Sequence, residues 1–163
     1  MKLYMLLFFL FFCKAMLFAQ HDSLPLYKQF PTIPPFTLLN ISDSTTFTKA
    51  NLLKRKPTLI ILFSPDCDHC KHFTSQLIAN IDVVQHYQII MVSFLDNELI
   101  KKFYTAYALS KYSNIIVSKD SAYFLGTFYA LHTYPSIILY NKKGKLVQMF
   151  DGTVPIKTIA AAL

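Results

Sequence analysis

Three nearly continuous apolar runs constrain the fold of this 163-residue chain more than any other feature. They lie at residues 58–63, 88–94 and 136–140, so each is short. Short apolar runs without polar alternation are typical of strands that are covered on both faces. A sheet buried on both faces needs helices on either side, so the sequence predicts an α/β fold.

The segments between these runs supply the other elements of that fold. Four helices are expected, at residues 66–80, 97–109, 121–131 and from Pro155 onward. Two more strands and a small hairpin are expected, at residues 114–117, 145–150 and 36–48. A turn at residues 141–144 makes the last two strands antiparallel neighbours. The sequence therefore predicts one domain with a mixed sheet flanked by helices.

The first twenty residues differ in character from the rest of the chain. An apolar run at residues 3–13 lies between Lys2 and Lys14, and a short tail follows it. This pattern is typical of a secretory signal peptide, whereas a membrane anchor needs about 20 apolar residues. We therefore predict that residues 1–20 are a cleaved signal peptide, with a membrane anchor as the alternative. The protein is then expected to be exported to the periplasm or cell envelope.

Residues 21–35 contain four prolines and are expected to form an extended lead-in without a core of its own. Residues 36–163 then make up the globular domain. The whole chain has 16 basic and nine acidic residues. The basic residues are spread along the sequence without a basic–aromatic repeat, so we expect a solvated surface and no nucleic-acid partner.

The placement of the cysteines indicates which reaction the domain could carry out. Cys13 lies in the predicted signal peptide, which leaves Cys67 and Cys70 in the sequence Cys67-Asp68-His69-Cys70. Cys67 is expected at the start of a helix, where free N–H groups and the helix dipole favour a thiolate. Cys70 begins an inward-facing stripe of the same helix. An exposed thiol that attacks and a shielded thiol that resolves are what disulfide exchange requires.

Other uses of this cysteine pair stay open. A structural disulfide would close a loop of two residues and so remove little chain entropy. A metal site could combine both cysteines with His69 or His72, which makes a copper metallochaperone the alternative function. A peroxidase site would resemble P-x-x-x-T-x-x-C, which the residues before Cys67 do not match. We expect no metal and no cofactor other than a redox-active Cys67–Cys70 disulfide.

Together these features resemble the thioredoxin superfamily, and most closely its exported thiol-disulfide oxidoreductases of the TlpA/ResA type. The matching parts are residues 33–38, 63–70, 97–117 and 133–136, followed by Gly144 and Gly152. The resemblance covers the chain from about residue 33 to its end. It implies a thioredoxin-like three-layer fold with a mixed central β-sheet. It also implies a reductase that acts on disulfide-containing envelope proteins and is recharged by a membrane electron-donor protein.

The resemblance assigns roles to residues around the dithiol. Pro135 is expected to be cis and to face Cys67, while Tyr134 offers its backbone to an extended substrate. A trans Pro135 that simply opens a strand is the alternative. Asp68 and His69 are expected to support the site. His69 is shared with strongly oxidising relatives, which conflicts with the reductase direction, and a solvent-facing His69 without a role is its alternative.

The chain also departs from the pattern of these relatives. Where relatives carry a buried acid, six residues before the first cysteine or three after the second, this chain has Ile61 and Phe73. Asp66 replaces the tryptophan that usually precedes the first cysteine. The sequence therefore identifies no carboxylate that could exchange a proton with Cys70.

Overall fold

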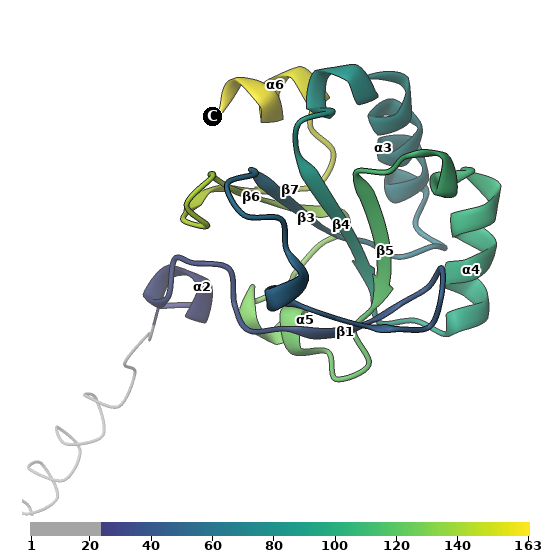
Figure 1. Cartoon of the computed structure of the whole chain (residues 1–163), viewed down its shortest axis with the longest axis horizontal. Coiled ribbons are helices and arrows are strands. Elements are labelled where there is room, and N and C mark those ends of the chain that lie inside the picture. Colours follow the sequence, from purple (N-terminus) through teal and green to yellow (C-terminus); the bar gives the residue numbers. More distant parts are fainter. Residues whose placement is uncertain (1–23) are drawn as a thin grey trace, which may run out of the picture.

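The computed structural model describes residues 24–163, and Figure 1 shows them as a central sheet with helices on both faces. The predicted signal peptide and Cys13 lie outside the described residues. The strands are β1 (Thr37–Asn40), β2 (Thr46–Thr48), β3 (Thr58–Leu62), β4 (Gln88–Ser93), β5 (Ile115–Lys119), β6 (Ser136–Tyr140) and β7 (Leu146–Asp151). The α-helices are α2 (Leu26–Gln29), α3 (Asp68–Ala79), α4 (Asn97–Ala106), α5 (Phe124–Phe128) and α6 (Ile156–Ala161).

The three apolar runs form the middle of the sheet. The seven strands lie in the order β2-β1-β5-β4-β3-β6-β7, and β3 pairs in parallel with β4 and antiparallel with β6. Strand β5 runs parallel to β4, so the carboxyl ends of β3, β4 and β5 lie at one edge. Strand β6 begins at that same edge, where Ser136 is the partner of Leu62. The predicted mixed sheet is confirmed.

Alternation along the central strands divides the core into two layers. Leu59 and Ile61 of β3 face one layer, where they pack with helices α3, α4 and α6. Ile60 and Leu62 face the other layer, where they pack with α5 and with the segment that follows α2. Because both faces are covered, every residue of β3, β4 and β6 is buried. The structure therefore has the expected three layers.

Two helices end earlier than their sequence patterns predict. Helix α4 stops at Ala106, because Ala108 adopts a left-handed conformation with φ of 47°. Helix α5 is limited to Phe124–Phe128, since Tyr123 before it and Ala130 after it also have positive φ. Such conformations are uncommon for residues other than glycine and are not signalled by these side chains.

The lead-in belongs to the fold more closely than its proline content suggests. It contains the short helix α2, and Thr32 forms an isolated bridge with Lys145. Ile33 and Pro34 are buried, and Ile33 joins the core layer on the α5 side. Within residues 24–163, no helix has the length and apolar character needed to cross a membrane.

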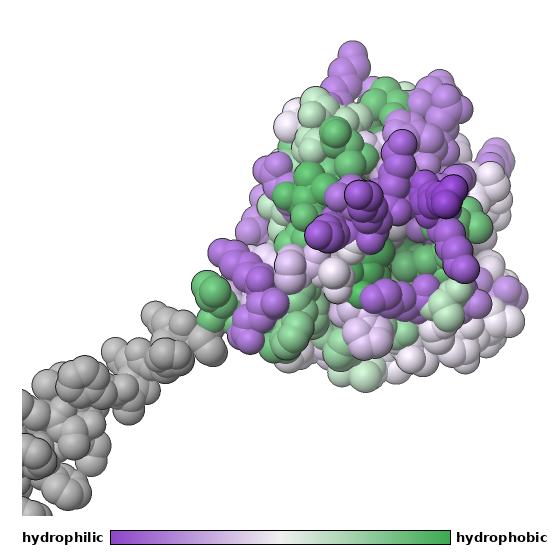
Figure 2. All heavy atoms as spheres, turned by 60° about the vertical axis from the view of Figure 1, so that its left-hand side comes forward, coloured by the Kyte–Doolittle hydropathy of each residue, from purple (hydrophilic) through white to green (hydrophobic). Residues whose placement is uncertain are grey.

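The basic residues are less evenly distributed in space than in the sequence. Six of them surround a groove at the start of β3, and none of the acidic residues in the described part of the chain lines it. They are Lys49, Lys54, Arg55, Lys56, Lys142 and Lys143. Figure 2 shows hydrophilic side chains gathered around exposed hydrophobic surface on the side of the molecule that carries α2. The groove lies at the opposite end of β3 from Cys67.

Candidate functional site

The pairing of β3 with β6 brings the predicted site residues together. Strand β3 ends at Leu62, and the chain then turns through Ser64 and Pro65 to reach Cys67. Since Ser136 pairs with Leu62, the two residues before β6, Tyr134 and Pro135, lie beside that turn. Residues 67 positions apart in the sequence thus meet at the carboxyl edge of the central strands.

Cys67 is the N-cap residue of α3 and is only partly buried. Its thiol donates a hydrogen bond to the carbonyl oxygen of Tyr134 across 3.7 Å. Its carbonyl oxygen accepts the N–H of Lys71 and so begins the helix. A thiol in this position, at the start of a helix and partly exposed, can be reached by a disulfide from outside.

Cys70 has the opposite environment. Its side chain is 1% exposed and packs in the core with Phe73 and Leu77, as the inward stripe predicts. Burial raises the pKa of the Cys70 thiol to about 12, the neighbouring Cys67 adds to this, and a hydrogen bond from the Ser64 backbone partly opposes it. Both cysteines are free thiols. The pair therefore combines an accessible sulfur with a shielded one that stays protonated near neutral pH.

The Tyr134–Pro135 peptide bond is cis. Pro135 precedes the first residue of β6, and its carbonyl oxygen accepts the N–H of Gly152. The ring of Tyr134 packs partly against both core layers, while its carbonyl oxygen faces Cys67. This geometry leaves Tyr134 at the boundary between the dithiol and the opposite face of the sheet.

The two residues between the cysteines lie on the surface. Asp68 and His69 are exposed, and Asp68 accepts a hydrogen bond from the Lys71 ammonium at 2.9 Å. That hydrogen bond holds the pKa of Asp68 below its usual value. His72 is exposed as well. Among residues 24–163, no group of three or more histidine, cysteine or acidic side chains is arranged to hold a metal ion.

The two positions where relatives carry a buried acid hold apolar side chains in this chain. Ile61 and Phe73 are fully buried in the layer that contains Cys70. A buried polar atom does occur one helical turn beyond Cys70, where the Thr74 hydroxyl has no hydrogen-bond partner among the described residues. Proton exchange with Cys70 must therefore use solvent or a group that is not a neighbouring carboxylate.

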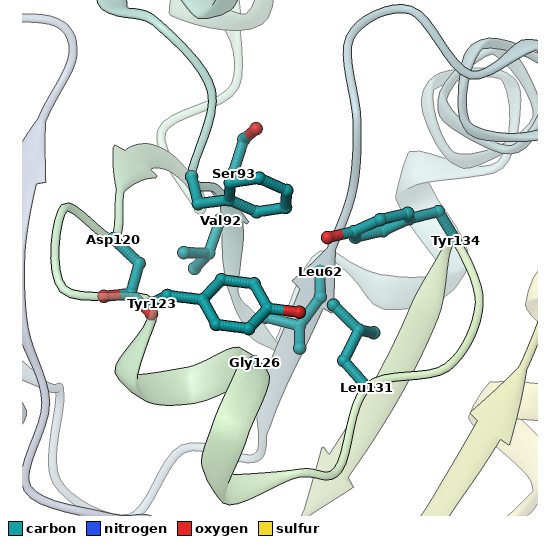
Figure 3. Close-up of a pocket in the computed structure, with 9 residues that line it drawn as sticks. Leu62, Val92, Ser93, Asp120, Tyr123, Gly126, Leu131 and Tyr134 are labelled. Carbon is teal, nitrogen blue, oxygen red and sulfur yellow. The ribbon is translucent and has the colours of Figure 1, made fainter.

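A crevice beside Tyr134 was not predicted from the sequence. Figure 3 shows the rings of Tyr123 and Tyr134 directed toward each other above Leu62 and Leu131. Phe94 completes this crevice, whose volume of about 10 Å³ is close to what one water molecule needs. Phe94 follows β4 and Tyr123 follows β5, so only the strand order brings them to Tyr134. The one sequence signal is that Phe94 ends the apolar run at residues 88–94 and that Tyr123 lies a few residues beyond the next strand, at the edge where both strands end.

Comparison with protein-family models identifies the family of this domain. Residues 46–163 match the model of a thioredoxin-like domain, which is more than half of the chain. The chain belongs to the thioredoxin-like family. A search of curated proteins found no significant match to this thioredoxin-like chain.

Several solved structures share the thioredoxin-like fold. A secreted Mycobacterium tuberculosis disulfide oxidoreductase homologous to Escherichia coli DsbE is 18% identical with a TM-score of 0.66, covering 79% of this chain and 96% of its own. The exposed lipoprotein thioredoxin Etrx1 of Streptococcus pneumoniae is 20% identical with a TM-score of 0.64, covering 80% and 100%. StoA from Bacillus subtilis is 19% identical with a TM-score of 0.62, covering 81% and 98%. At these identities the likeness establishes the fold.

Proposed function

We propose that this thioredoxin-like protein is an exported thiol-disulfide oxidoreductase, and that it reduces disulfides in proteins of the cell envelope. The observation that carries the proposal is the pairing of a partly exposed Cys67 with a buried Cys70 beside the Tyr134–Pro135 loop. Export is supported by the signal-like residues 1–20 and by relatives that are described as secreted or exposed.

The proposed exchange proceeds in two steps. The Cys67 thiolate attacks one sulfur of a substrate disulfide, forms a mixed disulfide and releases the other substrate sulfur as a thiolate. Cys70 then loses its proton and attacks the Cys67 sulfur, which releases the second substrate thiol and leaves a Cys67–Cys70 disulfide. Two electrons pass from the dithiol to the substrate, and a membrane electron-donor protein returns them. No bound cofactor is needed for these steps.

Tyr134 and Pro135 are proposed to hold the substrate during the attack. An extended substrate segment can pair with the backbone of Tyr134, in the manner of an added strand. The carbonyl oxygen of Tyr134 accepts a hydrogen bond from the Cys67 thiol, with 3.7 Å between sulfur and oxygen. A segment paired at Tyr134 therefore lies next to the attacking sulfur. Asp68 and His69, both exposed, are proposed to tune the approach of the partner rather than to enter the bond changes.

The reduction potential of the Cys67–Cys70 pair tests the direction of the reaction. A potential near or below about −250 mV is expected for a reductase, whereas a value near about −120 mV would identify an oxidase. Insulin-disulfide reduction tests the activity itself, with the Cys67→Ser and Cys70→Ser variants as comparisons. The first variant should be inactive, and the second should accumulate mixed disulfides. Full activity in both variants would refute the proposal.

A further inference from the structure

The groove at the start of β3, here called the basic groove, has no part in the exchange chemistry. Its volume is about 500 Å³, within the range of sites that hold a small molecule or a lipid headgroup. None of its six basic side chains forms an ion pair within residues 24–163, where the one paired cation is Lys71, bound to Asp68. Clustered cationic side chains without acidic partners attract anions. The basic groove is therefore suited to an anionic ligand.

Hydrogen bonds to the backbone fix the walls of the basic groove. On one wall, the Gln88 side chain accepts the N–H of Leu53 at 2.8 Å and donates to its carbonyl oxygen at 3.1 Å. On the other wall, the N–H of Ile33 donates to the carbonyl oxygen of Gly144 at 3.2 Å. Walls that are fixed before a ligand binds reduce the ordering cost of binding.

The most exposed apolar side chains of the described structure lie on the same side of the molecule. Leu24, Phe30 and Leu53 are 61%, 59% and 57% exposed, more than any other large apolar side chain in residues 24–163. Leu53 lines the basic groove itself. Phe30 is three residues from Ile33, which also lines it, so their Cα atoms lie within about 11 Å of each other. In Figure 2, hydrophilic side chains surround hydrophobic surface on this side.

This combination separates two kinds of anionic partner. A soluble polyanion would engage the basic side chains and leave Leu53 and Phe30 in water. A bilayer offers phosphates to the cations and, directly beneath them, an apolar region that buries exposed leucine and phenylalanine side chains. Basic residues interspersed with exposed apolar side chains are typical of proteins that lie on an anionic membrane surface.

We propose that the basic groove, together with Leu53 and Phe30, binds the surface of a membrane that contains anionic phospholipids. Headgroup phosphates lie among the basic side chains, and the two apolar side chains enter the headgroup boundary. Strand β3 spans about 16 Å between the groove and the turn that leads to Cys67. The dithiol therefore faces away from the lipid and stays open to other proteins. This inference goes beyond the exchange activity and does not depend on it.

The first test uses tryptophan fluorescence, because the full-length chain contains no tryptophan. Leu53→Trp places a single reporter in the basic groove, and Phe94→Trp places one at the opposite edge of the sheet, where Phe94 is 40% exposed. With vesicles of equal parts phosphatidylglycerol and phosphatidylcholine, emission from the first variant should shift to shorter wavelength, and emission from the second should not. Residues 1–20 are the same in both variants, so attachment through them alone would not separate the two reporters.

The second test removes charge from the groove. One basic residue near an anionic membrane contributes about fivefold to association. The triple variant Lys54→Gln/Arg55→Gln/Lys56→Gln should therefore bind these vesicles at least about tenfold more weakly than the unaltered chain. Gln88 holds only the backbone of Leu53, so the loop keeps its shape.

The matched control is the triple variant Lys101→Gln/Lys102→Gln/Lys111→Gln. It removes the same charge from exposed positions on and after α4, and its binding should weaken by less than about threefold. Equal weakening in both triple variants, or no shift in Leu53→Trp, would overturn the inference. Binding of polyglutamate that only the groove variant loses, without a shift on vesicles, would also overturn it and assign the groove to an acidic protein. Insulin reduction should be unchanged in the groove variant, so the exchange function is tested separately.

Discussion

The Cys67 thiol lies 3.7 Å from the carbonyl oxygen of Tyr134, although the two residues are 67 positions apart in the sequence. Pairing of β3 with β6 holds this contact, which places the more accessible sulfur beside the backbone on which we propose that a substrate segment pairs. The same contact separates the roles of the cysteines, because only Cys67 faces the loop while Cys70 is enclosed by the core.

Alkylation should distinguish the two thiols. With a pKa of about 12, about one Cys70 thiol in 10⁵ is ionised at pH 7, and its side chain is 1% exposed. Iodoacetamide should therefore label Cys67 in the folded, reduced protein and leave Cys70 unmodified. In Cys67→Ser, the labelling rate of Cys70 at pH 8 should be at least about 10³-fold lower than in the unfolded chain. Comparable rates before and after unfolding, measured by mass spectrometry, would contradict the assignment.

The resolving step should depend strongly on pH. Burial raises the pKa of Cys70, and the apolar Ile61 and Phe73 occupy the positions where relatives carry an acid. The rate at which Cys70 resolves a mixed disulfide should therefore rise about tenfold per pH unit between pH 7 and about 11. Rapid-mixing measurements on a preformed mixed disulfide at Cys67 would show this slope. A plateau beginning near pH 8 would reveal a proton acceptor close to Cys70.

The central strands were the most predictable part of the fold. Nearly continuous apolar runs predict β3, β4 and β6 to within one residue, because strands covered on both faces carry few polar side chains. The placement of the two cysteines was equally predictable, since the buried strand before them and their spacing put Cys67 at the start of α3 and Cys70 on its inward side. The limits of α5 were not predictable, because Tyr123 and Ala130 adopt positive φ without any glycine signal.

The crevice beside Tyr134 could not be predicted either, but the reason is different. Its three rings come from segments that follow β4, follow β5 and precede β6. Phe94 ends the predicted strand at residues 88–94 and Tyr123 lies in the predicted helix at residues 121–131. Neither pattern shows that the rings meet, and only the order β5-β4-β3-β6 places them together. The gathering of six basic residues around one groove has the same origin, because spatial order is not contained in local sequence.

Asp120 should contribute to stability through the start of α5. It is 3% exposed, and one carboxylate oxygen accepts the Leu125 N–H at 2.7 Å. Asp120→Ala removes this acceptor and should lower the free energy of unfolding by about 1–2 kcal/mol. Asp120→Asn keeps an acceptor and should lose less than about half of that. Equal losses in both variants, measured by urea unfolding, would show that the capping hydrogen bond is not the cause.

A buried pair of tyrosines should show strong coupling. The hydroxyls of Tyr129 and Tyr140 are 2.8 Å apart in a layer where both side chains are fully buried. Either single phenylalanine substitution leaves one buried hydroxyl without its partner and should cost about 1–3 kcal/mol of unfolding free energy.

The double variant Tyr129→Phe/Tyr140→Phe leaves neither hydroxyl without its partner. Its free energy of unfolding should be no lower than that of the less stable single variant. Burial also raises the pKa of Tyr140 to about 12, above the value near 10 of an unfolded tyrosine. The folded state therefore binds the Tyr140 proton more tightly, and this contribution to stability is present below pH 10 and is lost as the pH rises toward 12. Alkaline unfolding should accordingly begin at a higher pH in the double variant. If the two substitutions changed the free energy of unfolding by strictly additive amounts, the hydroxyls would not interact.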